Sequence, residues 1–449
     1  MSPPRPILGL ELELTVAALG AAGDGVAPSE AGRIYLPGGL PGERWLARLA
    51  RPLAEGWRAE PVRCLAPRPR ADPICPHFGR CGGCRLQHLP PDAYAAFKRQ
   101  RIVDALERRG LPTQHVGEPA LAPPASRRRL RLGLAAEAAG TLRLGLRARG
   151  SHRLEPIEAC PIACPELSAL LAPLASALGG ALAAPLPAEA SLTLTATGVD
   201  LLLHAARPPT AAERLRLPAL ADALDLARLS WAAGSTTPEP LSVRRPPVVE
   251  FGAVTVDLSP GGFLQATAFG ERRLAAAVAA WSAGCRHAVD LFAGVGTLTF
   301  ALDPGIRSAH ACEADPAAAT ALRRAAGSTR LGRVTVETRD LDRRPLTAPE
   351  LARRDLVVLD PPRAGALAQA RLLARAPVER VVYASCHPES FARDARLLVE
   401  GGYRLAELRP IDQFRYAAEV ELVALFQRPS AGRRHKSPPD QPSNSSSLG

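Results

Sequence analysis

The stretch Ala288-Val-Asp-Leu-Phe-Ala-Gly-Val-Gly296 joins an apolar, strand-like run to a glycine loop that leads into a helical segment. From about residue 250 onward, similar runs alternate with helical patterns, at 288–292, 309–313, 334–337, 356–360 and 380–385. This alternation predicts a parallel sheet with right-handed crossovers, in an α/β domain of Rossmann-like type. Ligands of such open sheets bind outside the carboxyl ends of the strands. We therefore expect the functional site in the loops that follow these runs.

The glycine loop does not match a dinucleotide site. Gly294 and Gly296 are followed by Thr299 where the G-x-G-x-x-G pattern has its third glycine. The acid Asp290 at the start of the loop would repel a pyrophosphate, but it suits a ligand that carries an ammonium group. S-adenosylmethionine has such a group on its amino-acid end.

Two further acids follow the next strand-like runs. Glu313 is placed to accept hydrogen bonds from both ribose hydroxyls of a nucleoside, as acids at this position do in dinucleotide folds. Asp340 could reach the adenine amine. Three acidic strand ends in register predict a site for the methyl donor S-adenosylmethionine.

A rigid turn and a thiol end the last two runs. Asp360-Pro-Pro-Arg363 presents a carboxylate and carbonyls rigidly, because each proline fixes φ near −65°. This turn suits the edge of a flat base. Cys386, in Val381-Val-Tyr-Ala-Ser-Cys-His-Pro388, has a buried, inert cysteine as its simplest interpretation, but its position at a strand end indicates a nucleophile in the crevice.

Two glutamates near the end alternate with apolar residues. Glu419 and Glu421 fall where a loop enters a final strand and would project from one face. A solvated edge strand explains Glu419 as well as function does.

A cluster of cysteines lies in a segment with little other pattern. Cys75, Cys81 and Cys84 are closely spaced, and Cys160 and Cys164 follow at a distance. Three close thiolates and one distant thiolate can hold zinc or an iron–sulfur cluster, and the spacing does not choose between them. The alternative is a group of buried cysteines without a metal.

Composition is compatible with a nucleic-acid partner. The chain has 449 residues and a formal net charge of +12, which favours a polyanion, although arginine accounts for nearly all of the positive charge and indicates a bias in base composition. No run is long enough to span a bilayer, and the N-terminus does not have the layout of a secretory signal. We therefore expect a cytoplasmic protein without a membrane partner.

The pattern divides the chain into four parts. We expect a small antiparallel β-barrel in 1–63, a mainly β central domain with the cysteine cluster in 64–245, the α/β domain in 246–428 and a disordered tail in 429–449. The strand-borne Arg127, Arg129 and Arg131 of the central part are candidates for binding phosphates.

On these motifs the chain resembles the bacterial RNA 5-methyluridine methyltransferases, most closely the iron–sulfur 23S rRNA (uracil-5-)-methyltransferases. The resemblance covers nearly everything except the tail. It implies that 14–49 belong to a TRAM RNA-binding barrel and that a 4Fe-4S cluster is held by Cys75, Cys81, Cys84 and Cys160, with Cys164 as a spare.

The same resemblance assigns roles in the α/β domain. It implies that Cys386 is the nucleophile and Glu421 the general base, and it places Gln265, Phe292, Glu313 and Asp360 at the cofactor site.

The chain departs from the family pattern at two positions. His387 replaces the usual asparagine after the nucleophile, and Glu419 replaces the histidine two residues before the base.

The resemblance also implies a mechanism. The Cys386 thiolate would add to carbon 6 of uracil and make carbon 5 nucleophilic. A cytosine-5 methyltransferase would carry a cysteine where Arg363 stands, and an Asp-Pro-Pro N-methyltransferase would need no thiol. A tRNA uridine-5-methyltransferase and a non-catalytic RNA-binding module are the remaining alternatives.

Overall fold

The structure, a computed structural model, describes residues 8–30, 32–136, 142–327 and 333–428. The tail predicted for 429–449 lies outside the described residues. Within the described ranges, no helix is both long and apolar enough to cross a membrane.

The C-terminal sheet carries the predicted strands. Its order is β19-β18-β17-β20-β21-β23-β22-β7. The five strands expected from sequence are all present, as β17 (His287–Leu291), β18 (Ser308–Glu313), β19 (Arg333–Thr338), β20 (Leu356–Leu359) and β21 (Arg380–Ser385). They pair in parallel, as expected.

Beyond the predicted parallel strands, the sheet ends in antiparallel strands at one edge. Strand β23 (Glu421–Gln427) runs antiparallel to both β21 and β22 (Arg404–Asp412). The short strand β7 (Ala120–Leu121) completes this edge beside β22. Strands β22 and β23 form a hairpin, and β23 is antiparallel to β21. The loop between β22 and β23 therefore lies at the same end of the strands as the loop that follows β21.

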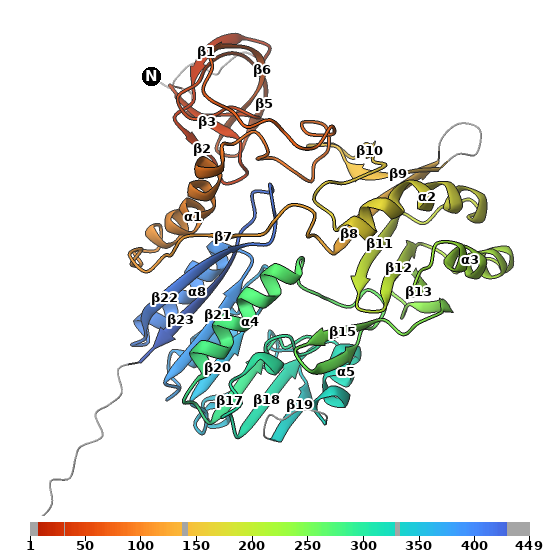
Figure 1. Ribbon diagram of the computed structural model, residues 1–449. Helices are drawn as coiled ribbons and strands as arrows, with labels where there is room; N and C mark the ends of the chain where they lie inside the picture. The colour runs from red at the N-terminus through yellow and green to blue at the C-terminus, as the bar shows by residue number, and fades with distance from the viewer. Residues whose placement is uncertain (1–7, 31, 137–141, 328–332, 429–449) are drawn as a thin grey trace, which may run out of the picture.

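Helices cover both faces of this sheet (Figure 1). Leu356 and Val358 pack with α4 (Ala268–Ser282) on one face, whereas Val357 and Leu359 pack with helices on the other. The helices of this second core are α1 (Pro91–Glu107), α7 (Leu367–Leu373) and α8 (Pro388–Glu400). Burial on both faces explains the continuous apolar run of β20. Two further helices, α5 (Pro316–Ala326) and α6 (Ala348–Leu351), connect the strands.

The N-terminal part forms a six-stranded sheet of order β1-β5-β6-β4-β3-β2. Figure 1 shows these strands curling around a common interior, where Ile34, Leu36 and Leu49 are buried. The strands are β1 (Glu11–Thr15), β2 (Ala18–Leu19), β3 (Gly25–Ser29), β4 (Gly32–Leu36), β5 (Arg44–Leu53) and β6 (Gly56–Ala66).

The middle part is a seven-stranded sheet of order β10-β9-β8-β11-β12-β13-β14. Its strands are β8 (Arg129–Ala136), β9 (Leu142–Arg147), β10 (Leu154–Pro156), β11 (Glu189–Thr195), β12 (Gly198–Ala205), β13 (Arg228–Ala233) and β14 (Glu239–Val243). Two helices that the strand pattern did not predict, α2 (Pro165–Ala181) and α3 (Ala211–Ala223), share its core. A hairpin of β15 (Val248–Phe251) and β16 (Val254–Asp257) leads into the C-terminal sheet.

Candidate active site

A cavity of about 990 Å³ opens at the carboxyl ends of the C-terminal strands. We call it the strand-end cavity. Nearly all of the predicted site residues of the α/β domain line it, although they come from seven separate segments: Gln265, Phe292, Gly294, Glu313, Asp340, Asp360, Cys386 and Glu421. The topology of the sheet thus collects residues that are up to 156 positions apart, from Gln265 to Glu421, around one space.

The glycine loop has the backbone that its sequence requires. Gly294 and Gly296 have φ of 55° and 97°, and Phe292 before them has φ of 62°. Gly296 supports the loop from behind: a Cβ there would lie 2.5 Å from Leu322 and 2.6 Å from Phe300. The predicted cofactor role of Gly296 is therefore indirect, through close packing of the loop.

Glu313 ties this loop to the neighbouring strand. Its carboxylate accepts the Gly294 N–H at 2.7 Å and the Asp315 N–H at 2.8 Å. Glu313 keeps partial exposure toward the cavity, which leaves its oxygens able to accept a further donor. Asp340, in the loop after β19, also faces the cavity and accepts two backbone N–H groups of its own turn.

Asp290 is buried at the base of the cavity. One carboxylate oxygen accepts the Thr299 hydroxyl at 2.5 Å, and its Oδ1 has no hydrogen-bond partner among the described residues. Burial raises the pKa of Asp290 to about 7. A cationic ligand group would satisfy Oδ1 and stabilise the charged form.

Four polar side chains form a hydrogen-bonded series along the cavity wall. Gln265 Nε2 donates to Asp360 Oδ2 at 3.0 Å, and Gln413 Nε2 donates to Gln265 Oε1 at 2.8 Å. Gln413 Nε2 also donates to Glu421 Oε2 at 2.8 Å, while its Oε1 accepts the Ala266 N–H. Gln413 was not predicted from sequence, because it belongs to no motif and only begins the β22–β23 loop, directly after Asp412.

The two carboxyl groups of this series hold protons more tightly than usual. Burial raises the pKa of Glu421 to about 8, and the charge of Asp360 adds to the effect. Burial likewise raises the pKa of Asp360 to about 6, against the hydrogen bond from Gln265. A carboxylate with a pKa near neutrality is suited to proton transfer.

Cys386 follows β21 and faces the same cavity. Burial raises the pKa of its thiol to about 11, and the charges of Glu421 and Asp360 raise it further. Arg363, in the Asp-Pro-Pro turn, acts in the opposite direction and favours the thiolate. Electrostatic interactions thus couple the pKa of Cys386 to the charges of Glu421 and of the Asp-Pro-Pro turn.

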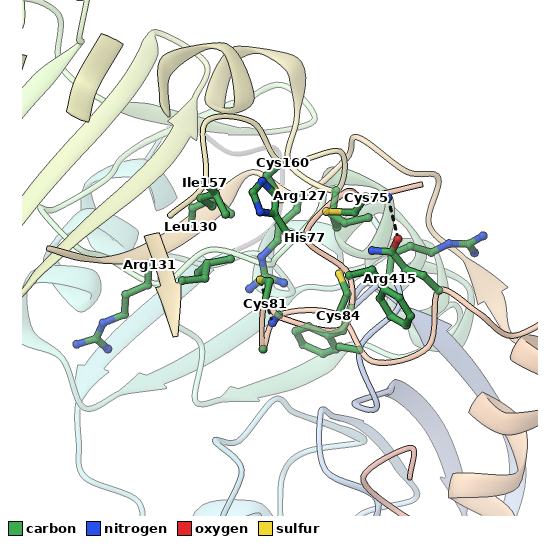
Figure 2. A pocket seen from close by; sticks show the side chains of 18 of the residues that line it. Cys75, His77, Cys81, Cys84, Arg127, Leu130, Arg131, Ile157, Cys160 and Arg415 are labelled. Carbon is green, nitrogen blue, oxygen red and sulfur yellow. Dashed lines mark hydrogen bonds between the residues drawn. The ribbon is translucent and has the colours of Figure 1, made fainter. Parts of the chain in front are cut away.

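The predicted metal ligands surround a second cavity of about 450 Å³ (Figure 2). All four line this cysteine cavity: Cys75, Cys81, Cys84 and Cys160. Cys164 does not line it, and packs instead in the core of the central sheet. Cys386 lines both cavities, so the cysteine cluster and the candidate nucleophile are neighbours.

Three thiols of this cluster hold their protons more tightly than usual when no metal is bound. Burial raises the pKa of Cys75 and Cys81, and that of Cys84 to about 12. A bound metal reverses this preference because its charge stabilises thiolates. His77 lies at the cavity wall, with Nδ1 3.3 Å from Glu155. His88 is buried behind it, without a hydrogen-bond partner among the described residues.

The three arginines expected to bind phosphate have different surroundings. Arg131 is exposed and pairs with Glu189. Arg129 donates to the Leu264 carbonyl at 2.8 Å and lies over the Phe263 ring, with 5.3 Å between its guanidinium carbon and the ring centre. Arg127 points into the cysteine cavity among the sulfurs (Figure 2). Of the three, Arg131 is the one whose exposure fits a phosphate contact.

The two departures from the family pattern have local explanations. His387 is the N-cap of α8, where Nδ1 accepts the Ser390 N–H at 3.3 Å. Burial lowers the pKa of His387, so the neutral ring is available as an acceptor, as an asparagine oxygen would be. Glu419 is exposed and lines the cysteine cavity, whereas Glu421 is buried in the strand-end cavity.

Acidic strand ends around a glycine loop, in an α/β sheet with an antiparallel edge hairpin, define a methyltransferase fold. The comparisons with known proteins agree. No family model matches the chain. An uncharacterized RNA methyltransferase of Caulobacter vibrioides is 40% identical over 425 residues, which cover 93% of this chain and all of that protein. The chain therefore belongs to the RNA methyltransferase family.

Two other relatives carry more specific names. The 23S rRNA (uracil(1939)-C(5))-methyltransferase RlmD of Chromohalobacter salexigens is 36% identical, with 92% of this chain and 89% of that protein covered. The crystal structure of the Pyrococcus abyssi tRNA (uracil-54, C5)-methyltransferase in complex with S-adenosyl-L-homocysteine matches with a TM-score of 0.72 and 21% identity. It covers 92% of this chain and 99% of that one, and at this identity the likeness concerns the fold.

Proposed function

We propose that this protein methylates carbon 5 of a uridine in RNA, with S-adenosylmethionine as the methyl donor. The observation that carries the proposal is that Cys386 and Glu421 line one cavity, where Glu421 is connected through Gln413 and Gln265 to Asp360. A nucleophile and a buried base that line the same cavity are what substitution at carbon 5 of a pyrimidine needs. An N-methyltransferase would need neither group.

The residues of the strand-end cavity fit the donor. The unsatisfied Oδ1 of Asp290 suits the ammonium of its amino-acid end, and Glu313 suits the ribose hydroxyls. Asp340 is available for the adenine amine, and Phe292 for apolar contact. When bound, the donor supplies an electrophilic methyl group on a sulfonium.

Cys386 begins the reaction. Its thiolate attacks carbon 6 of uracil, so that a sulfur–carbon bond forms and the electrons of the 5,6 double bond move toward the oxygen on carbon 4. Carbon 5 becomes nucleophilic and would accept the methyl group of the bound donor, whose sulfur–methyl bond breaks with both electrons going to the sulfur, so that S-adenosylhomocysteine leaves. Arg363 favours the thiolate, which burial and the neighbouring carboxylates otherwise oppose.

Glu421 ends the reaction. Its carboxylate removes the remaining hydrogen from carbon 5 as a proton, and the electrons of that bond restore the 5,6 double bond. The carbon–sulfur bond breaks and Cys386 leaves as a thiolate. Gln413 orients Glu421 and lowers its pKa through their hydrogen bond. The target uracil must be splayed out of the RNA to reach this pocket.

The relatives support 23S rRNA as the target. The Chromohalobacter protein, whose name gives a 23S rRNA uracil, is 36% identical, whereas the Pyrococcus tRNA enzyme is 21% identical. We further propose that the N-terminal sheet is a TRAM barrel that binds RNA. We also propose three domains: the barrel in 1–63, a central domain in 64–245 and the catalytic domain in 246–428.

We also propose a 4Fe-4S cluster in the cysteine cavity. Around one zinc ion, tetrahedral sulfurs lie about 3.8 Å apart, since each Zn–S bond is about 2.3 Å. In the described part of the chain, the one group of three or more ligand atoms within 4.8 Å of one another is His310, Cys312 and Glu337. Among the cysteines of this cavity, no three sulfurs lie that close to one another, a spacing that fits the larger size of a cluster of several iron atoms.

Release of tritium tests the proposed function. RNA labelled at carbon 5 of its uridines with tritium should release tritium to water only when S-adenosylmethionine is present, in step with the formation of 5-methyluridine. Release from cytidine-labelled RNA instead would show a cytosine-5 enzyme. Methyl incorporation without release would show an N-methyltransferase, and RNA binding without incorporation would show a binding module.

A further inference from the structure

The loop between β22 and β23 supplies part of the strand-end cavity wall. Gln413 and Phe414 line the cavity, and the loop ends at Glu421. The position of this loop therefore fixes the position of the candidate base. One buried side chain from another part of the chain, Lys98 of α1, holds it.

Lys98 is fully buried, with 0% of its side chain exposed. Its ammonium pairs with Asp412 at 2.8 Å and donates to the carbonyls of Ala417 at 2.8 Å, Phe414 at 3.3 Å and Glu419. These acceptors are spread from the first to the last turn of the loop. One cation thus closes the loop around itself.

The identity of this residue is itself informative. Of the 56 basic residues of the chain, lysine occurs only at positions 98 and 436, and the rest are arginine. A planar guanidinium cannot direct its donors to acceptors that surround a point, whereas a compact ammonium can. Lysine at this buried position matches the need for a point-like donor.

Two further sets of hydrogen bonds hold the loop together with Lys98. The Tyr94 hydroxyl bonds to Asp412 and accepts the Tyr416 N–H at 2.8 Å. The backbone N–H groups of Arg85 and Leu86, which directly follow Cys84, donate to the Tyr416 carbonyl at 2.7 and 3.0 Å. Both contacts hold the middle of the loop, where Tyr416 has a φ of 61°.

We propose that Lys98 is a positioning residue for Glu421: by fixing the loop 413–420 it sets the Gln413–Glu421 hydrogen bond and so the removal of the carbon-5 proton. The inference rests on the proposed function, because it assigns Lys98 to one step of that reaction. It predicts that loss of Lys98 affects the last step and leaves the attack by Cys386 and the methyl transfer intact.

The substitution Lys98→Met tests this in the full-length protein. RNA with 5-fluorouridine at the target stops after methyl transfer, because fluorine cannot leave as a proton. We expect the variant to form this adduct with S-adenosylmethionine at a rate within about threefold of the unaltered protein. On ordinary RNA, turnover should fall about 10- to 100-fold, and a covalent protein–RNA complex should accumulate.

A second variant removes the cost of an unpaired buried charge. Lys98→Met leaves Asp412 without its cation, and Lys98→Met with Asp412→Asn leaves a neutral pair that keeps the contact to Tyr94. If Lys98 acts only on stability, the double variant restores both melting temperature and turnover. If Lys98 holds the loop carbonyls, melting temperature recovers and turnover stays low.

Three results would overturn the inference: unchanged turnover of Lys98→Met, equal loss of adduct and turnover in a folded variant, or recovery of turnover in the double variant. If the unaltered protein itself forms no adduct, the proposed function fails, and that outcome is visible before any variant is measured.

Discussion

At the level of single residues, the proposed reaction depends on two buried groups, Cys386 and Glu421, that must both be deprotonated. Cys386 must lose a proton to attack, and Glu421 must lose one to act as a base, yet burial raises the pKa of both. Both groups are therefore more active at higher pH. The same burial excludes water from the bond between sulfur and carbon.

Removal of the base should separate the two halves of the reaction. We expect Glu421→Gln to lower turnover about 100- to 10,000-fold, because no carboxylate is left to accept the carbon-5 proton. The adduct with 5-fluorouridine RNA should still form. Denaturing gel electrophoresis of protein with labelled RNA measures both quantities, and loss of the adduct together with turnover would contradict the assigned role.

Substitution of Gln413 should change how turnover depends on pH. Its hydrogen bond lowers the pKa of Glu421, which burial raises to about 8. In Gln413→Met the pKa of Glu421 should rise, so the carboxylate appears at higher pH and the rising limb of the turnover profile moves upward. Gln369→Met is the matched control, since Gln369 is equally buried but bonds to Leu346 outside the cavity. A profile that shifts equally in both variants would argue against the role of Gln413.

At the scale of elements, most of the parallel sheet could be predicted from sequence. The five runs from 288 to 385 are strands β17 to β21, because strands buried on both faces are continuously apolar. A final strand was expected after Glu419, but the antiparallel direction of β23 could not be foreseen, since it depends on pairing with β22 and leaves no local pattern. For the same reason Gln413, which becomes functional through the β22–β23 hairpin, carried no signal.

Helices α2 and α3 were missed for a different reason. Each contains an internal proline, Pro173 and Pro218, which argues against a helix in a local pattern. Packing against the central sheet offsets that cost. These two helices are stabilised by contacts with residues that are distant in sequence, so a local sequence pattern could not predict them.

The glycine loop gives a prediction about an element. Gly296→Ala adds a Cβ at 2.5 Å from Leu322 with φ of 97°, so the loop must shift. At Gly294 an added Cβ meets no protein atom within 4 Å, so within the protein Gly294→Ala has the cost of a left-handed backbone, about 1–2 kcal/mol. We expect calorimetry to show a loss of S-adenosylhomocysteine affinity of tenfold or more for Gly296→Ala, and a smaller loss for Gly294→Ala. The reverse order would contradict the supporting role of Gly296.

At the scale of the whole molecule, the central and C-terminal sheets meet around two cavities that share Cys386. The sequence order of the sheets could be predicted from pattern, but their meeting point could not. Helix α1 and strand β7, from the part assigned to the central domain, pack on the C-terminal sheet. This arrangement brings Lys98 and the cysteine segment to the loop 413–420.

The proposed 4Fe-4S cluster in the cysteine cavity leads to a prediction about the metal content of the protein. Protein purified without oxygen should contain about four iron atoms per chain and absorb visible light, as four-cysteine clusters do. Cys84→Ala should lose most of the iron, whereas Cys164→Ala, in the core of the central sheet, should keep it. Elemental analysis decides, and a colourless protein with one zinc would contradict the cluster.

The central claim is that a sulfur–carbon bond forms between Cys386 and carbon 6 of a uracil. The most direct measurement is mass spectrometry of peptides from protein that has reacted with 5-fluorouridine RNA and S-adenosylmethionine. We expect a methylated fluorouracil nucleotide on the peptide that contains Cys386, and none in Cys386→Ala. An adduct on another side chain, or methylated RNA from Cys386→Ala, would contradict it.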